Sequence, residues 1–154
     1  MMDTMNLWID VARDDLMALL SQIDGLILND EEATMLGGAD DPADAAAAIA
    51  AMGPRFVVVT LGGRGCVLVD ADGATALPAM AVEEVVDPTG AGDSFCGGFM
   101  GYLATAGNCQ RQTMEQALRI GSVTASFTLG SFGLDGLLGA TPAAIAARMD
   151  ALEK

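Results

Sequence analysis

Residues 87–95 read Asp-Pro-Thr-Gly-Ala-Gly-Asp-Ser-Phe and stand immediately before a long stretch without charge. That stretch, to residue 106, is rich in Gly, Ala, Met and Leu, which predicts a buried helix whose first turn is the glycine-rich segment. Such a helix start can hold an anion, because its first N–H groups lack intrahelical acceptors and Gly90 and Gly92 carry no obstructing side chain. Asp93 follows where these donors converge, and a carboxylate there suits a base that accepts a proton from a hydroxyl.

Residues 87–95, with Gly-Gly-Phe at 97–99, resemble the C-terminal signature of the PfkB, or ribokinase-like, carbohydrate kinases. In that family the Gly-Ala-Gly-Asp run forms an anion hole, and its aspartate activates the acceptor hydroxyl for attack on the γ-phosphate of ATP. The resemblance therefore implies that Gly90, Ala91 and Gly92 hold the phosphoryl group and that Asp93 is the catalytic base. It implies a kinase for a hydroxyl of a sugar or nucleoside-like small molecule, with ATP and Mg²⁺ as cofactors.

A second segment, Asn-Asp-Glu-Glu at residues 29–32, follows a short apolar run. It resembles the family's Asn-x-x-Glu motif, whose glutamate organises magnesium and its waters, so the resemblance assigns Asn29 to the nucleotide site and Glu32 to the metal. An indirect carboxylate contact is reasonable because Mg²⁺ keeps several of its waters. Asn before acidic residues is also the pattern of an ordinary helix cap and first turn, and this interpretation stays open.

A third segment, Thr-Leu-Gly-Gly-Arg-Gly at residues 60–65, lies between two β-rich runs. In the family a similar Thr-x-Gly-x-x-Gly turn contacts the nucleotide, which makes Thr60, Gly62 and Gly65 candidate ATP-binding residues. The alternative is a plain glycine-rich hairpin turn, and both interpretations can hold together. Arg64 either approaches phosphate or is a solvated turn residue.

Asp87 also has two interpretations. It can start the turn, since Asp side chains bond nearby backbone N–H groups and Pro88 fixes the φ of its own residue. Some relatives use the matching position near a monovalent cation such as K⁺, which makes Asp87 a candidate metal residue. Asp3 and Asn6 match loosely a family position near the phosphates.

Composition narrows the classes of function. A net charge of −14 with only 7 Lys and Arg residues argues against nucleic acid or an anionic membrane as a partner. Histidine is absent, which removes Ser-His-Asp and Cys-His systems and leaves a carboxylate as the general base. Three widely spaced cysteines in apolar surroundings predict reduced core residues of a cytoplasmic protein. No secretory signal or membrane span is visible in the sequence.

The order of elements predicts an α/β fold with a partly parallel sheet. Strands are expected near residues 2–6, 25–28, 55–60, 65–70 and 74–78, with a short extended piece at 82–86. Helices are expected near residues 13–21, 30–36, 42–52, 91–106, 111–129 and 142–152. The family resemblance implies a ribokinase-like three-layer sandwich, truncated at its N-terminus, in which residues 1–154 are the C-terminal nucleotide-binding and catalytic portion.

The resemblance covers about the C-terminal half of the family, so we expect the lid and most of the acceptor pocket to be absent. The isolated chain should then transfer phosphate weakly or not at all. A truncated sheet leaves an apolar edge, which favours a homo-oligomer. The alternative function is a non-catalytic nucleotide-binding module. A Rossmann oxidoreductase is remote because Phe95 stands where the third glycine belongs, and no Gly-Lys-Ser/Thr of a P-loop occurs.

Overall fold

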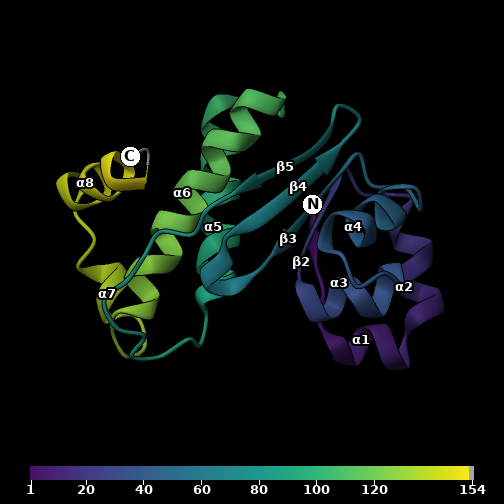
Figure 1. Ribbon diagram of the computed structural model, residues 1–154, viewed down its shortest axis with the longest axis horizontal. Helices are drawn as coiled ribbons and strands as arrows, with labels where there is room; N and C mark the ends of the chain where they lie inside the picture. The colour runs from purple at the N-terminus through teal and green to yellow at the C-terminus, as the bar shows by residue number, and fades with distance from the viewer. Residues whose placement is uncertain (153–154) are drawn as a thin grey trace. The chain divides into compact units, whose positions relative to one another are not determined.

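The computed structural model describes residues 1–152. These divide into two compact units, one of residues 1–76 and one that begins at Leu77. The first unit contains a sheet and its crossover helices, and the second is helical (Figure 1).

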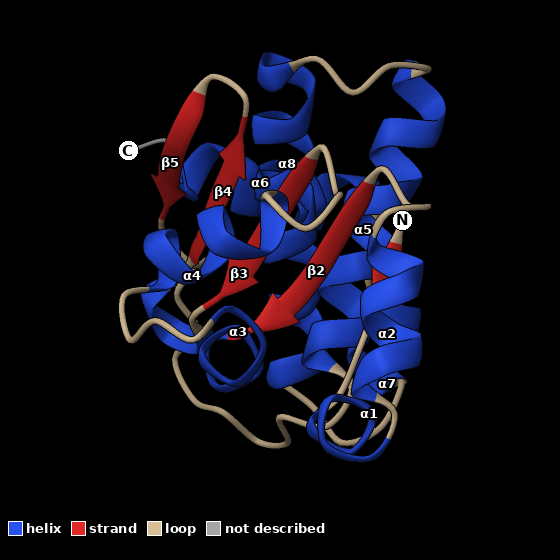
Figure 2. Cartoon of the chain, turned by 90° about the vertical axis from the view of Figure 1, so that its right-hand side faces the viewer, coloured by secondary structure: helices blue, strands red, loops and turns tan. Residues whose placement is uncertain are grey.

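The sheet has five strands in the order β1-β2-β3-β4-β5. The pairs β1–β2 and β2–β3 are parallel, whereas β3–β4 is antiparallel, so the expected partly parallel sheet is confirmed. Figure 2 shows β2 and β3 running side by side in the same direction. The strands are β1 (Met2–Asp3), β2 (Gly25–Asn29), β3 (Phe56–Thr60), β4 (Cys66–Asp70) and β5 (Gly73–Leu77).

Helices connect the parallel strands and cover one face of the sheet. Alternate residues of each strand point to the same face, and those on this face join a buried cluster with residues of the helices, including Leu20, Leu36 and Ile49. The helix α4 begins at Pro42 because the Asp41 side chain accepts from the N–H groups of Ala43 and Asp44. The helices of this unit are α1 (Asn6–Val11), α2 (Arg13–Leu20), α3 (Asp30–Gly37) and α4 (Pro42–Ala50).

The expected N-terminal strand at residues 2–6 is too long. Only Met2–Asp3 forms a strand, and the short helix α1 begins at Asn6. Its sequence, Asn-Leu-Trp-Ile-Asp-Val, is rich in residues that favour strands. Tertiary packing outweighs this preference, because the helix places Ile9, which is 2% exposed, in the core cluster.

Up to residue 152, the second unit has four helices: α5 (Ala91–Ala106), α6 (Arg111–Leu129), α7 (Asp135–Leu138) and α8 (Pro142–Leu152). The helix α7 was not expected from the sequence. Residues 82–86 lie in no strand, and the N–H of Val86 donates to the carbonyl of Leu129. The helix α8 buries no residue, and its Arg148 guanidinium lies over the Phe127 ring and donates to the Ser126 hydroxyl at 2.6 Å.

The expectation of a buried helix after the glycine-rich segment is met on one stripe of α5 only. Only Phe95, Phe99 and Leu103 of α5 are buried, four residues apart on one stripe, whereas Met100 and Tyr102 are exposed. An uncharged helix rich in Gly and Ala carries no polar residues that would have marked its outer face. The core prediction for the cysteines is wrong for Cys109, which is exposed, although Cys66 is buried and all three are free.

In the described residues, none of the helices combines the length and the apolar character that crossing a bilayer requires.

Gly121 permits the close approach of α6 to α5. A Cβ at this position would lie 2.8 Å from the Phe95 carbonyl oxygen. We therefore expect Gly121→Ala to lower the free energy of unfolding by about 1–3 kcal/mol, since the helices must separate. Gly101→Ala is the matched control, because a Cβ there meets nothing within 4 Å and should raise stability by about 0.5–1 kcal/mol. Urea unfolding of both variants tests this, and equal midpoints would refute the account of the crossing.

Candidate phosphate-binding site

The start of α5 is built by a turn that only glycine adopts readily. Gly90 precedes the helix with φ 76°, in the left-handed region, and its carbonyl accepts from the N–H of Ser94 at 2.9 Å. The N–H of Ala91 is used in the turn, where it donates to the Pro88 carbonyl. No side chain caps the helix. The N–H groups of Gly92 and Asp93, in the first turn, therefore have no acceptor within the helix.

The motif residues are accessible. Gly92 and Asp93 are exposed, and Gly90 and Ala91 are half-buried. A Cβ added at Gly90 would lie 4.0 Å from an Asp93 carboxylate oxygen, so this carboxylate stands beside the glycine turn. The N–H donors without acceptors and the positive end of the helix can bind an anion. The carboxylate beside them can accept a proton.

Two contacts behind the turn hold it against α6. The Ser94 hydroxyl is 2.7 Å from that of Thr128, which is buried, and Phe95 packs in the interior. Sequence reasoning did not find Thr128, because its partner is 34 residues away and no local pattern marks it.

Asp87 initiates the loop before this turn. Its carboxylate accepts from the N–H of Thr89 at 2.9 Å, which confirms the turn interpretation. The pKa of Asp87 is lowered, mainly by the bond from the Thr89 backbone N–H. Hydrogen bonds with the Thr89 side chain and the Gly133 backbone lower it further. The role near a monovalent cation stays a prediction.

In the first unit, the candidate residues Asn29 and Thr60 meet at one edge of the sheet. They are the last residues of β2 and β3 and are partners in the parallel ladder. Figure 2 shows α3 leaving from the end of β2 at this edge. Ligands of parallel α/β sheets bind at the carboxyl ends of the strands, so the pair occupies a suitable position.

Asn29 and Glu32 form a reciprocal capping box. The Asn29 side chain accepts from the N–H of Glu32, and the Glu32 carboxylate accepts from the N–H of Asn29, both at 2.9 Å. The helix-cap interpretation is therefore confirmed, and the metal role of Glu32 stays a prediction. Glu32 is 6% exposed. Burial raises its pKa, the bond from the Asn29 N–H offsets part of that rise, and the nearby carboxylate of Asp3 adds to it.

The glycine-rich turn joins β3 to the antiparallel β4, which confirms the hairpin interpretation. Gly62 and Gly65 have φ values of 57° and 101°, which favour glycine. Arg64 is paired, because its guanidinium lies 2.7 Å from the carboxylate of Asp30 at the start of α3. Both side chains are exposed, so the pair adds little stability. Thr60 uses its hydroxyl for a long bond of 3.4 Å to the Leu28 carbonyl.

The candidate residues thus form two groups, each within one unit. Asn29, Glu32, Thr60, Gly62 and Gly65 belong to residues 1–76, and the others belong to the second unit. Across residues 1–152, no three Cys, Asp or Glu side chains gather as ligands for one metal ion. A Mg²⁺ ion bound by Glu32 or Asp87 would then complete its shell with water and phosphate oxygens, which suits its chemistry.

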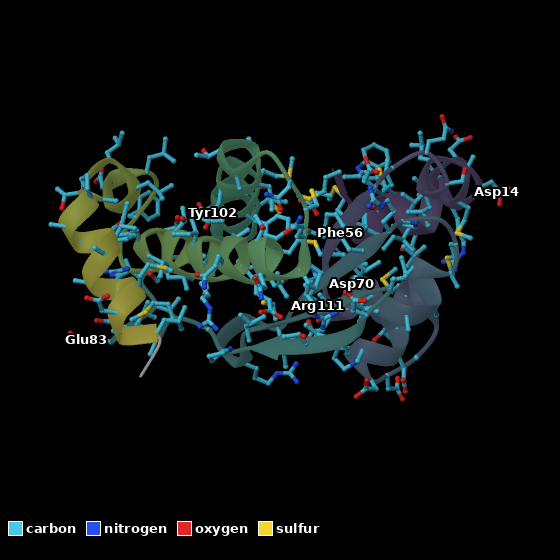
Figure 3. All side chains as sticks on the ribbon, turned by 90° about the horizontal axis from the view of Figure 1, so that it is seen from above. Asp14, Phe56, Asp70, Glu83, Tyr102 and Arg111 are labelled. Carbon is cyan, nitrogen blue, oxygen red and sulfur yellow. The ribbon has the colours of Figure 1, made fainter. Side chains whose placement is uncertain are left out.

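A cavity of about 410 Å³ lies in the second unit, and part of its lining comes from the residues just before Asp87. None of the candidate residues lines this cavity. Figure 3 labels one residue of the lining, Glu83, near α8. Its lining is Ala81, Val82, Glu83, Glu84, Val86, Ser126, Gly130 and Arg148.

The raised pKa of Glu32 predicts a pH-dependent stability. A buried carboxyl with a raised folded pKa binds a proton on folding, so its contribution is present at acid pH and is lost as pH rises above about 4. Glu32→Gln removes this loss. The free energy of unfolding of the Glu32→Gln variant, minus that of the natural chain, should therefore increase as the pH rises from about 4 to 7. Denaturant titrations at several pH values measure the difference. The exposed neighbour Glu31 supplies the control, and an equal trend for Glu31→Gln would contradict the assignment.

Comparison with known proteins identifies the family of this chain. The model of the pfkB family carbohydrate kinases matches residues 2–138. The chain is 36% identical to the cytidine kinase of Thermococcus kodakarensis over 123 residues, which cover 79% of this chain and 42% of that protein.

Solved structures agree with this match. A fructokinase double mutant from Vibrio cholerae O395, in fructose-, ADP- and potassium-bound form, aligns with a TM-score of 0.80 and 26% identity over 89% of this chain and 44% of its own. An aminoimidazole riboside kinase from Salmonella enterica, complexed with aminoimidazole riboside and an ATP analog, aligns with a TM-score of 0.80 and 23% identity over 91% and 46% of the chains, a likeness of fold.

The expected ribokinase-like α/β fold is confirmed by these alignments. The chain spans less than half the length of the relatives described above. Since the family model matches residues 2–138 and those relatives are kinases, this chain belongs to the pfkB family of carbohydrate kinases.

Proposed function

We propose that this chain is the nucleotide-binding and catalytic portion of an ATP-dependent kinase that phosphorylates a hydroxyl of a sugar or nucleoside-like small molecule. The start of α5 carries the proposal. Its first turn has no side-chain cap, Gly90 opens it in a left-handed conformation, and the exposed carboxylate of Asp93 stands beside Gly90. Family membership supplies the reaction class, since its named relatives are kinases.

In this reaction Asp93 accepts the proton of the acceptor hydroxyl. The hydroxyl oxygen then attacks the γ-phosphorus of ATP while the bond to the β,γ-bridging oxygen breaks and ADP leaves. The anion hole is assigned to the backbone N–H groups at Gly90, Ala91 and Gly92, which would stabilise the charge of the moving phosphoryl group. Of these, the N–H of Gly92 has no acceptor within the helix, whereas that of Ala91 donates to the Pro88 carbonyl. Because the chain has a net charge of −14, local backbone donors are needed to attract a triphosphate.

The nucleotide itself is assigned to the first unit's edge of parallel strands. Asn29 and Thr60 end adjacent strands there, and the Gly62–Arg64 turn follows Thr60. Glu32 in the first unit and Asp87 in the second each offer an oxygen ligand, which fits Mg²⁺ held partly through water, and such an ion would neutralise charge on the phosphates. A K⁺ ion near Asp87 is consistent with the potassium ion in the Vibrio cholerae fructokinase structure.

The proposed class of acceptor, a sugar or nucleoside, is taken from the names of the relatives, which are kinases of cytidine, fructose and aminoimidazole riboside. A non-catalytic nucleotide-binding module is the second candidate. The observation that favours it is the uncapped first turn of α5, whose N–H donors can bind a phosphate whether or not an acceptor hydroxyl is present. A cytoplasmic location and a homo-oligomeric state stay predictions.

Replacing the base separates binding from chemistry. Asp93→Asn should bind ATP with Mg²⁺ within about threefold of the natural chain, because the backbone donors remain, and should lower any phosphoryl transfer by about 10²–10⁴-fold. Isothermal titration and ADP release with cytidine, ribose or fructose measure the two effects. Nucleotide binding by both proteins without turnover by either would favour the module. If neither protein binds ATP, the proposed half-site fails for this chain.

A side chain at Gly92 tests the backbone donors directly. Gly92→Val should weaken ATP binding by about tenfold or more, since the side chain stands over the N–H groups that receive the phosphate. Gly97→Val is the control one turn further along α5. Neither position has a neighbour within 4 Å of an added Cβ, so both variants should fold. Equal affinities of the two variants, measured by titration, would place the phosphate elsewhere.

A further inference from the structure

We propose that Thr128 is a positioning residue for the motif segment, defined as residues 87–93. Its hydroxyl acts through Ser94 and holds the first turn of α5 in the orientation that presents the N–H groups of Gly92 and Asp93 to a phosphate. The inference rests on the proposed function and deepens it, because it names a group that fixes the geometry of the site without contacting the substrate.

The end of α6 holds the motif segment on both sides. Before the segment, the N–H of Val86 donates to the carbonyl of Leu129 at 2.8 Å. After it, the Ser94 hydroxyl lies 2.7 Å from the hydroxyl of Thr128, 34 residues away. Thr128 and Leu129 are consecutive residues of α6, which lies beside α5 (Figure 1). Two neighbouring positions of one helix therefore set where the segment begins and where it ends.

Local contacts alone hold the first turn of α5 weakly. Its cap residue, Gly90, supplies no side-chain hydrogen bond. Gly92 and Asp93 are exposed, and a Cβ at Gly92 would meet nothing within 4 Å. Phe95 is the first buried residue of the helix. Since helix ends fray, the bond of the Ser94 hydroxyl, one residue after Asp93, restrains the turn where its packing is weakest.

Thr128 is a rigid partner for this bond. It is 3% exposed, and Leu118 and Val123 of the same helix are fully buried. A buried hydroxyl that loses its partner is destabilising, so the bond to Ser94 is maintained. Its length is confined to a narrow range, which fixes the distance of Ser94 from α6. Successive helical residues are related by a fixed rotation and rise, so the N–H groups of Gly92 and Asp93 are oriented with Ser94.

Amide hydrogen exchange tests this role without nucleotide. The N–H of Ser94 donates to the Gly90 carbonyl, so its exchange reports whether the first turn is formed. Thr128→Val removes the hydroxyl and should raise this exchange rate by about tenfold or more relative to the Phe99 amide, further along α5. Thr128→Ser keeps the hydroxyl and should stay within about threefold of the natural chain. An equal rise at both amides, or none at Ser94, would overturn the proposal.

Thr124→Val is the matched control on the same helix. The Thr124 hydroxyl donates to the Ile120 carbonyl within α6, so its removal should leave the Ser94 amide unchanged. Ser94→Ala removes the other partner of the bond and should loosen the first turn as Thr128→Val does. This variant changes a half-buried residue, so it provides the same test if the change at the buried Thr128 prevents folding.

Titration with ATP and Mg²⁺ connects the turn to the site. Thr128→Val should weaken binding by about tenfold or more, and Thr128→Ser should bind within about threefold of the natural chain. A loosened turn with unchanged affinity would overturn the positioning role and leave the proposed function intact. If the natural chain binds no ATP, the proposed function fails, and the exchange of the Ser94 amide alone decides whether Thr128 holds the turn.

Discussion

The candidate site depends on the way α5 begins. A side chain at the preceding residue can satisfy the first N–H groups of a helix, as Asn29 does at α3 and Asp41 does at α4, whereas several other helices of the chain have no such cap. At α5 that position is Gly90, which has no side chain and a left-handed φ. The donors of this first turn are therefore left to a ligand or to water, and the carboxylate of Asp93 is held next to them.

Contacts between α5 and α6 fix that turn. Phe95 anchors the first turns of α5 in the interior, Ser94 reaches Thr128, and Gly121 lets the two helices approach closely. In the first unit a different constraint operates. Parallel strands connected by helices bring their carboxyl ends to one edge, and this places Asn29 beside Thr60 although 31 positions separate them in the sequence.

Several residues have structural roles that coexist with the proposed ones. Asn29 and Glu32 cap α3, and Asp87 bonds to Thr89. A hydrogen bond from a backbone N–H fixes the orientation of a carboxylate. A fixed carboxylate is suited to hold a water molecule that is bound to a metal ion. The role of Glu32 near phosphate stays a proposal beside its capping role. The pairing of Arg64 with Asp30 removes a cation that the sequence left available.

The sequence by itself determined the main elements and the glycine turn. Short apolar runs rich in β-formers, and helical patterns with their caps, placed most strands and helices within one to three residues, because these signals are local. Only the tertiary structure decided the rest. It turned residues 6–11 into a helix through burial of Ile9, left one side of α5 exposed, and joined Ser94 to Thr128. Each of these outcomes depends on groups distant in the chain, whose packing outweighs local preference.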